Sequence, residues 1–532
     1  MSATGTKKLT GREFYRSLGS PKMIVAPMVD RSEFAWRLLS RSFMKDDPSN
    51  RLLAYSPMLH ARLFKERASY RSQHFEATRS TTSNQAEKPV PFLDGNPAID
   101  RPLIVQFCAN DPDELLEAAK HVQAYCDAVD LNLGCPQGIA RKGRYGAFLQ
   151  EEPELIYKLI NKLHTELSIP VTAKFRVLET KESTLEYAKM ILSAGASFIS
   201  VHGRRREQKG HNTGVADWSY IRYLRDNLPS DTVIFANGNI LNHDDIQKCL
   251  EATGADGVMS AEGNLSDPTI FSEPPPVGEE GCEYWRGRDG KGGYRLDFIL
   301  RRYMDIIYKY VLETAPPERK PLFNPLGPTP ETTNGEPETA TPKPEQEEGP
   351  PRKKQKNSKA QKVLSPNLCA MQGHMFQLLR PLISKQTHIR DALARCRAGD
   401  MPAFEHVLSL VDQVVKQGIQ EYNANPALYE DPETQQQEED AVLSGSKATI
   451  AKYKRPWWVC QPHIRPLPEE AMQKGALQLK KKDSVEAEST KKGVSESGQM
   501  VVANGVASTV RSANGVQVER EIATSKEQLV SG

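Results

Sequence analysis

The sequence has no excess of charge of either sign, no closely paired cysteines and no long apolar run. Its 532 residues include 70 Lys and Arg against 68 Asp and Glu, so any basic surface must be local. The 8 cysteines form no Cys-x-x-Cys pair, which argues against a disulfide framework and favours a reducing compartment. The N-terminal segment lacks the apolar core of a signal peptide, and no segment is apolar over the thickness of a bilayer. We therefore expect a soluble protein of the cytoplasm, the nucleus or both, with no membrane span and no bound metal.

Short apolar segments between residues 20 and 272 alternate with stretches of helical length. They are continuous runs rich in Val, Ile, Leu and Phe, as in parallel strands that are covered on both faces. These segments are 23–29, 52–58, 103–109, 128–135, 171–177, 198–203, 232–239 and 256–263. Eight strands with helices between them predict an α/β protein with a (β/α)8 TIM barrel. A doubly wound open sheet is the alternative, but residues 26–34 lack the glycine fingerprint that it requires.

Composition divides the rest of the chain. Pro, Glu and Thr dominate one long segment, which then turns basic, and such a segment buries too little apolar surface to fold. The predicted order is an N-terminal arm (1–19), the barrel (20–272), a loop and first helix of a small helical domain (273–313), a disordered linker (314–362), the remainder of the helical domain (363–425), an extension with a Trp-Trp and Arg-Pro patch (426–469) and a disordered tail (470–532). The basic end of the linker fits either a nuclear-import signal or an RNA-contacting arm.

Polar residues and glycines stand at the carboxyl ends of the predicted strands, where TIM barrels place their active sites. Each is ordinary alone, and it is their joint placement that indicates a site. The candidates are Pro27, Met28, Val29, Gln106, Asn132, Cys135, Lys174, His202, Asn237, Gly238, Asn239, Ala261 and Glu262. Glycine at the last strand ends allows a phosphate to approach backbone N–H groups. An amide, an ammonium and an imidazole at one mouth suit a flat cofactor such as a flavin, with Lys174 near the anion of the reduced ring.

Cys135 ends the fourth predicted strand (128–135) and stands in the segment GCPQGIARKGRYG (134–146). A structural cysteine normally lies within a strand or a helix. Cys135 instead lies where a strand stops, with Pro136 and Gly138 close behind it. We interpret it as a residue that the loop presents to a ligand.

Several segments together resemble the tRNA-dihydrouridine synthases. They are GCPQGIARKGRYGAFL, AKFRV, VHGRRREQKG, NGN and SAEGN, with APMVDRSEFAWR and YSPM before them. The resemblance covers roughly residues 20–270 and extends more weakly through the helical domain. It is strongest to the eukaryotic branch that acts on uridines 16 and 17 of the D-loop. It implies an FMN-binding barrel followed by a helical domain that helps to hold tRNA.

The resemblance also implies individual roles. Pro27, Met28 and Val29 would line the flavin, Gln106 and Lys174 would contact its ring, and His202 would lie beside it. The residues that would hold the ribityl phosphate are Asn237, Gly238, Asn239, Ala261 and Glu262. Bacterial relatives have Gly-Arg at the last pair, so only the backbone of Glu262 would serve there.

The implied reaction reduces the C5–C6 double bond of uridine, with Cys135 as the acid. Reduced FMN, reloaded by NADPH or NADH, would give a hydride to C6, and Cys135 would give a proton to C5. An ordinary thiol is mostly protonated at neutral pH and can donate without special tuning. Nearby cations would favour thiolate, so we assign them to RNA phosphates that neutralise them on docking. These cations are Arg141, Lys142, Arg144, Arg204, Arg205 and Arg206. Asn132 would orient the flipped base.

Two other functions stay open on the sequence alone. A flavin barrel that acts on a free pyrimidine, such as a dihydroorotate dehydrogenase, could use the same loop cysteine but needs no basic helical appendage. An RNA-binding scaffold on an inactive barrel is the second, and the intact set of Cys135, Lys174 and His202 argues against it. We expect a monomer whose partner is tRNA, with other RNA left open.

Overall fold

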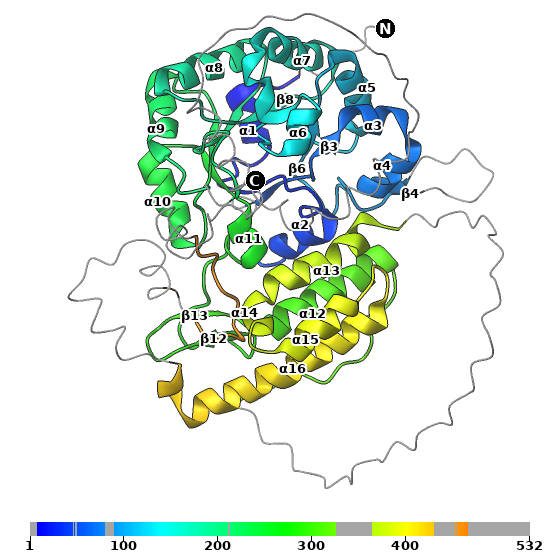
Figure 1. Ribbon diagram of the computed structural model, residues 1–532, viewed down its shortest axis with the longest axis vertical. Helices are drawn as coiled ribbons and strands as arrows, with labels where there is room; N and C mark the ends of the chain where they lie inside the picture. Colours follow the sequence, from blue (N-terminus) through cyan, green and yellow to red (C-terminus); the bar gives the residue numbers. More distant parts are fainter. Residues whose placement is uncertain are drawn as a thin grey trace, which may run out of the picture.

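The computed structural model describes residues 8–45, 47, 51–79, 90–210, 213–325, 364–429, 453 and 455–465. Most of the predicted linker, most of the 426–469 extension and the whole predicted tail lie outside these residues. In Figure 1 the chain up to about residue 272, blue to green, forms one body, and the green helix of residues 296–306 lies with the green-yellow to yellow helices in a second body below it. None of the described helices is both long and apolar enough to cross a membrane.

The first body is a closed parallel barrel. Its strands are β1 (Met23–Val25), β2 (Leu53–Tyr55), β6 (Leu103–Cys108), β7 (Ala128–Leu133), β8 (Val171–Arg176), β9 (Ile199–His202), β10 (Ile234–Asn237) and β11 (Gly257–Ser260). They are hydrogen-bonded in the order β2-β1-β11-β10-β9-β8-β7-β6, and pairing of β2 with β6 closes the ring. Each predicted segment contains one of these strands, so the predicted TIM barrel is confirmed.

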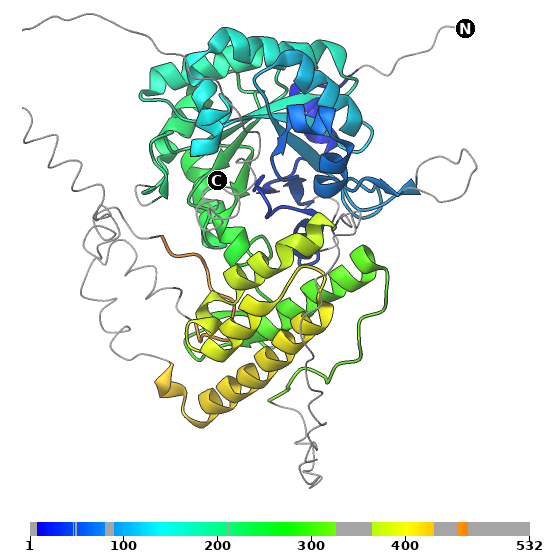
Figure 2. The ribbon, with the colours of Figure 1, turned by 45° about the vertical axis from the view of Figure 1, so that its right-hand side comes forward.

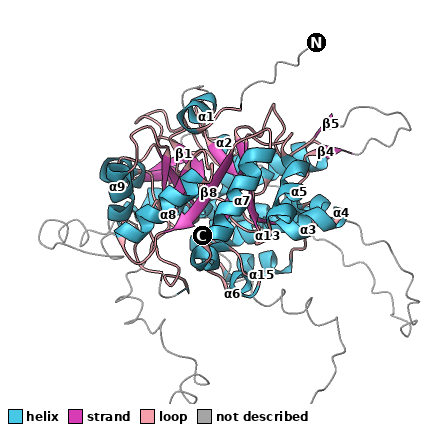
Figure 3. Cartoon of the chain, turned by 90° about the horizontal axis from the view of Figure 1, so that it is seen from above, coloured by secondary structure: helices cyan, strands magenta, loops and turns pink. Residues whose placement is uncertain are grey.

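Helices surround the strands, as the view from above shows (Figure 3). They are α2 (Phe34–Arg41), α3 (Ala61–Glu66), α4 (Ala68–His74), α5 (Pro112–Val122), α6 (Gly138–Lys142), the 3-10 helix η2 (Gly146–Glu151), α7 (Pro153–Glu166), α8 (Lys181–Ser193), α9 (Trp218–Asn227), α10 (Asp244–Thr253) and α11 (Glu262–Ser266). Small additions are β3 (Leu59–His60), which pairs with β6, and the hairpin of β4 (Thr78–Arg79) and β5 (Val90–Pro91).

Two segments without expected structure are ordered elements. The predicted N-terminal arm contains α1 (Gly11–Ser17), whose Phe14 ring stacks on Phe198 with centroids 5.7 Å apart. Arg12 donates to the carbonyls of Asp231 and Thr232, just before β10, so α1 covers the amino end of the barrel. The predicted loop after the barrel contains the hairpin β12 (Tyr284–Arg286) and β13 (Gly292–Tyr294). The helix α1 and the hairpin were not predicted because they depend on contacts between residues that are distant in the sequence.

The second body is the predicted helical domain. It contains α12 (Leu296–Ile306), which continues as the π-helix η4 (Ile307–Leu312), then α13 (Pro366–Leu378), α14 (Arg380–Ile383), α15 (Thr387–Arg395), α16 (Met401–Ala424) and the 3-10 turn η5 (Pro426–Leu428). Residues 314–325, assigned to the linker from the sequence, are packed on these helices. Arg319 pairs with Glu405 of α16 at 2.8 Å, and Arg301 of α12 donates to the Lys320 carbonyl at 2.6 Å.

Buried polar contacts join the helical domain to α2 of the barrel. The ring of His374 stacks on Trp36 with centroids 4.0 Å apart, and its Nε2 lies 2.8 Å from Glu33. Asn367 accepts a hydrogen bond from the backbone N–H of Ala35 at 2.8 Å. Because these groups are nearly inaccessible to solvent, the two bodies form one continuous core.

Candidate active site

Polar side chains line the interior of the barrel toward the carboxyl ends of its strands. Residues paired in register on neighbouring strands point to the same face of a sheet. The register pairs Gln106 with Asp130 and Asp130 with Thr172. A second set, paired in the same way, continues toward the carboxyl ends with Asn132, Lys174, Ser200, Arg176, His202 and Asn237. Candidates taken from separate strands of the sequence therefore converge on one mouth.

The lower layer is a closed hydrogen-bond network around a buried carboxylate. Gln106 Nε2 donates to Asp130 at 2.8 Å, and Thr172 Oγ1 donates to the other oxygen at 2.6 Å. Asn132 Nδ2 donates to Gln106 Oε1 at 2.8 Å. Burial raises the pKa of Asp130 to about 6, although the hydrogen bonds from Thr172 and Gln106 oppose the shift. The network fixes which way the Gln106 and Asn132 amides face.

The loop that carries Cys135 is held from two sides. Asn132 Oδ1 accepts the backbone N–H of Gly134 at 3.1 Å and of Cys135 at 2.9 Å. On the other side Gly146 has a φ of +67°, and a Cβ there would lie 2.8 Å from the Cys135 carbonyl oxygen. The Ala147 N–H donates to that oxygen at 3.1 Å. Cys135 is thus a fixed, half-buried residue at the barrel mouth, as the sequence predicted.

Burial raises the pKa of the Cys135 thiol, and this outweighs the opposing backbone hydrogen bond at Gln137 and the charges of Arg176 and Lys174. The cations with the largest effect on the sulfur thus come from β8 rather than from the basic run that follows it in sequence. The net effect keeps the thiol protonated at neutral pH. The sulfur is therefore suited to donating a proton.

Lys174 and His202 are both buried at the mouth. Burial and, to a smaller extent, the charge of Arg176 lower the pKa of Lys174 to about 8, against the opposing charge of Asp130. Burial, together with Arg176 and Lys174, holds the pKa of His202 well below its usual value. Nε2 of His202 lies 3.0 Å from Nη1 of Arg204. Because a guanidinium only donates, this nitrogen accepts and the ring proton is assigned to Nδ1.

The loops after β10 and β11 have the features of a phosphate site. Gly238 has a φ of +106°, and a Cβ there would lie 3.0 Å from Cδ2 of His202, so the position excludes a side chain. Asn239 Oδ1 accepts from Arg204 at 2.7 Å and from the Ala216 N–H at 3.0 Å. Oδ1 of Asn237 is buried and has no partner among the described residues. Open backbone, a guanidinium and an ammonium fit the phosphate and ring of a flavin mononucleotide.

Comparison with known proteins places this site in a family. The family model described as Dihydrouridine synthase (Dus) matches residues 24–284. The protein of Schizosaccharomyces pombe named tRNA-dihydrouridine(16/17) synthase [NAD(P)(+)] is 42% identical over 463 residues, which are 87% of this chain and 92% of that relative. The chain belongs to the dihydrouridine synthase family. The Saccharomyces cerevisiae protein of the same name is also 42% identical, over 87% of this chain and 88% of its own length.

Similarity to another branch of the dihydrouridine synthase family is lower and shorter. A human protein named tRNA-dihydrouridine(20a/20b) synthase [NAD(P)+]-like is 32% identical over 252 residues, 47% of this chain and 70% of that protein. The two yeast relatives extend the match through the helical domain, whereas the human one covers about half of this chain.

The remaining flavin-lining candidates of this synthase-family barrel follow β1. Pro27 and Met28 are buried, and Val29 is partly exposed. The Met28 backbone N–H donates to Ser32 Oγ at 3.0 Å, which fixes the turn from β1 into α2. At the opposite strand end, Ala261 is buried and Glu262 begins α11. The side chain of Glu262 contacts Arg465 and lies 3.8 Å from His463 Nε2.

The predicted RNA-contacting cations separate into two groups. Arg141, Lys142, Arg144 and Arg205 are exposed, and Arg206 is partly exposed, so these five remain available to a partner. Arg204 corrects the prediction: it is 3% exposed, and its guanidinium bonds to Gly214, His202 and Asn239 within the mouth. The contact of Asn132 with the base stays a prediction: its amide donates to Gln106 and accepts the Cys135 N–H, and these bonds fix its orientation at the mouth.

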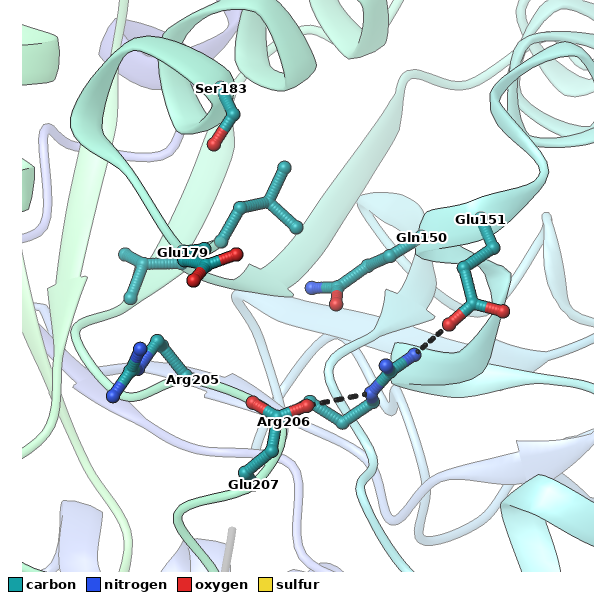
Figure 4. A pocket seen from close by; sticks show the side chains of 9 residues that line it. Gln150, Glu151, Glu179, Ser183, Arg205, Arg206 and Glu207 are labelled. Atoms are coloured by element: carbon teal, nitrogen blue, oxygen red, sulfur yellow. Dashed lines mark hydrogen bonds and ion pairs between the residues drawn. The ribbon is translucent and has the colours of Figure 1, made fainter.

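Surface hollows lie beside the mouth, on the side of the exposed cations. One of about 410 Å³ is lined by Arg141, Phe148, Glu151, Arg206, Glu207 and Lys209. A neighbouring one of about 480 Å³ is shown in Figure 4, where Arg206 lies between Glu151 and Glu207 and forms ion pairs with both. Lys209 donates to the Pro136 carbonyl at 2.8 Å, so this basic surface adjoins the Cys135 loop.

Sequence reasoning missed Asp130, Arg176 and Arg465. A sequence signal exists for the first two. Side chains alternate between the two faces of a strand, so in AVDLNL Asp130 shares a face with Asn132, and in VTAKFR Arg176 shares a face with Lys174. Arg465 has no local signal, since the segment that carries it reaches the barrel from far along the chain. Among the described residues, no group of three or more His, Cys, Asp or Glu side chains is placed to hold a metal ion.

Proposed function

We propose that this protein reduces uridine to dihydrouridine in tRNA, with uridines 16 and 17 of the D-loop as its targets. Support comes from the two yeast relatives that carry this name at 42% identity over 87% of the chain. Support also comes from the barrel mouth, where a protonated thiol and a lysine face a site that fits a flavin. The free-pyrimidine alternative does not account for a match that extends over 87% of the chain, and the scaffold alternative does not account for the intact mouth.

FMN, reloaded by NADPH or NADH, would supply the hydride for C6 of uracil when bound at the mouth. Lys174, whose buried ammonium has a lowered pKa, would stabilise negative charge on the reduced ring. Gln106, oriented by Asp130 and Asn132, would be the amide at the ring edge. The backbone at Gly238 and Asn239 would hold the phosphate.

Cys135 provides the proton. Once C6 carries the hydride, negative charge develops at C5, and the S–H bond of Cys135 breaks as a C5–H bond forms. The thiolate that remains takes a proton from solvent. Asn132 and Gly146 keep the sulfur at the mouth, where the base, turned out of its stack, would meet it beside the bound cofactor.

The tRNA backbone lies over the basic surface beside the Cys135 loop. Arg141, Arg206 and Lys209 surround Phe148, whose ring is partly buried. Cations around an aromatic ring bind phosphates and stack an unpaired base. The helical domain would contact the tRNA backbone outside the D-loop. Other RNA with a similar loop would use the same surface.

The single observation that carries the proposal is the Cys135 loop, held at the barrel mouth by Asn132 and Gly146, with Lys174 close enough for its charge to act on the thiol. The test maps dihydrouridine across tRNA from cells that lack the protein and are complemented with the wild type or with C135A. We expect positions 16 and 17 to regain dihydrouridine with the wild type alone. Purified protein that reduces free uracil or oxidises dihydroorotate, but leaves unmodified tRNA unchanged, would overturn the proposal.

A further inference from the structure

The segment 455–465 crosses from the helical domain to the barrel mouth. Figure 2 shows it in orange, leaving the base of the helical body and running up to the barrel. Trp458 is fully buried, and the Cys460 N–H donates to the Tyr294 carbonyl of β13 at 2.9 Å. Cys460 Sγ then contacts the Ser266 carbonyl, at the end of α11, at 3.1 Å. The buried indole and these contacts fix the course of the segment.

The segment ends with Arg465 against the end of β11. Its guanidinium contacts the Glu262 carboxylate, and the Arg465 side chain is 13% exposed. His463, two residues earlier, lies 3.4 Å from Ser266 Oγ and 3.8 Å from the same carboxylate. The Arg465 Nε atom is buried and has no hydrogen-bond partner among the described residues. The Arg465 side chain therefore reaches the end of β11, where its Nε atom lacks a hydrogen-bond partner among the described residues.

Two more guanidinium groups share this corner of the mouth. Arg204 bonds to the Gly214 carbonyl, to His202 and to Asn239, and Arg176 bonds to the carbonyls of Gly134, Arg205 and Gln208. All of these partners are neutral groups. Arg465 and Arg176 lie close enough to Arg204 for their charges to lower its pKa, and the Glu262 carboxylate contacts Arg465.

The charges act on one another through the protein. Burial, with smaller contributions from the charges of Arg465 and Arg176, lowers the pKa of Arg204 to about 9. Burial lowers the pKa of Arg465 to about 10. Burial and the same three cations help to keep His202 neutral, so no positive charge is added there. Holding like charges together in a desolvated corner is unfavourable unless an anion binds between them.

We propose that Arg465 binds the phosphomonoester of FMN, supplying from the C-terminal segment the guanidinium that the Glu262 side chain cannot provide from the barrel. The inference rests on the proposed function and adds a residue to it. Arg204, through Asn239, borders the same site from the β10 side. A phosphate dianion accepts two parallel hydrogen bonds from one guanidinium, and a side chain with an unbonded Nε is able to make them.

Glu262 has a distinct role in this arrangement. It holds Arg465 at the strand end through their ion pair, and its own charge repels an approaching phosphate. Removing Arg465 and removing Glu262 should therefore have opposite effects on FMN affinity. A simple structural ion pair predicts instead that both changes weaken the fold in the same way.

The test uses the full-length protein and compares FMN with riboflavin, which has the same ring and no phosphate. Binding is followed by quenching of flavin fluorescence in the wild type, Arg465→Gln, Arg465→Lys and Glu262→Gln. We expect Arg465→Gln to lower FMN affinity by about tenfold or more, the usual loss for a charged hydrogen bond. Riboflavin affinity stays within about twofold, Arg465→Lys loses less than Arg465→Gln, and Glu262→Gln binds FMN more tightly. Arg390→Gln, an arginine paired on the surface of α15, changes neither affinity.

Two further measurements distinguish FMN from the other phosphate-bearing molecules, NADPH and tRNA, that this corner could bind. The ratio of NADPH to NADH efficiency is expected to be unchanged in Arg465→Gln, and so is tRNA affinity. Equal loss of FMN and riboflavin binding, no loss of either, or a loss confined to NADPH or to tRNA would overturn the inference while leaving the proposed function intact. A wild-type protein that binds neither flavin would overturn the proposed function itself, and the inference with it.

Discussion

The side-chain oxygen of Asn132 accepts the backbone N–H of Cys135 at 2.9 Å, while the amide nitrogen of the same residue donates to Gln106 at 2.8 Å. One amide thus connects the loop that presents the sulfur with the side chain proposed to meet the flavin. Both groups come from different strands, and Asn132 sets their relative position.

Replacing Asn132 by alanine should misplace the sulfur without removing it. We expect N132A to lower the single-turnover rate of dihydrouridine formation by about 10- to 100-fold, because small displacements of a reacting group have effects of this size. FMN and tRNA affinities should change little. N161A, which changes a partly buried asparagine of α7 that bonds to the Ala194 carbonyl, is the matched control and should react at the wild-type rate. A normal rate for N132A would show that the Cys135 loop is held by other contacts.

Gly146 and Gly138 flank the same loop and differ in what a methyl group would meet. At Gly146 the backbone has a φ of +67°, and a Cβ would lie 2.8 Å from the Cys135 carbonyl oxygen. At Gly138 a Cβ would have nothing within 4 Å of it. We expect G146A to destabilise the protein by about 1–3 kcal/mol and to slow turnover, and G138A to do neither. Thermal denaturation with a single-turnover assay checks both, and equal behaviour of the two variants would contradict this reading of the loop.

Lys174 is charged in a buried site, so its removal should stabilise the protein while abolishing its chemistry. Lowering the pKa of Lys174 from the ordinary 10.5 to about 8 corresponds to a cost of about 3 kcal/mol in folding free energy at neutral pH. Because the unfolded chain binds more protons between pH 8 and 10.5, wild-type stability should rise with pH across that window. We expect K174M to melt higher at pH 7 and to lose this rise.

The control for Lys174 is an exposed lysine. Lys120 on α5 pairs with Glu117 at the surface, and K120M should match the wild type in melting temperature at every pH. A K174M variant that melts lower than the wild type at pH 7 would show that the ammonium is stabilised by the protein rather than held there for function.

Glu76 makes the contact between the barrel and the helical domain sensitive to pH. It accepts hydrogen bonds from Ser365 at 2.6 Å and from Asn367 at 3.2 Å, and burial raises its pKa to about 7. The folded protein therefore binds more protons than the unfolded chain between about pH 4.5 and 7, so this contribution to stability is present in acid and is lost as pH rises through 7.

The E76Q variant tests this contact. We expect its stability to exceed that of the wild type at pH 8 and the difference to shrink as pH falls to 5, in thermal denaturation at a series of pH values. Glu154, exposed in the first turn of α7, supplies the control E154Q, which should follow the wild type throughout. A constant difference between E76Q and the wild type across the series would contradict the raised pKa.

The barrel and most of its mouth were predictable because each part has a local pattern. Gln106, Lys174 and His202 stand near the ends of apolar runs, and the fixed geometry of a parallel barrel brings such ends together. The helix α1 was not predictable, because the burial of Phe14 depends on Phe198, which is far away in the sequence. Arg204 has the sequence environment of a surface cation and is buried by contacts with Gly214 and Asn239.

Proton donation by the Cys135 thiol can be measured in a single turnover. Wild-type, C135A and C369A proteins, the last changing an exposed cysteine on α13, are loaded with reduced FMN and mixed with excess unmodified tRNA in a single turnover. We predict that C135A forms dihydrouridine at least about 100-fold more slowly while binding FMN and tRNA normally, and that C369A reacts like the wild type. A C135A protein that forms dihydrouridine within about twofold of the wild-type rate would contradict the account.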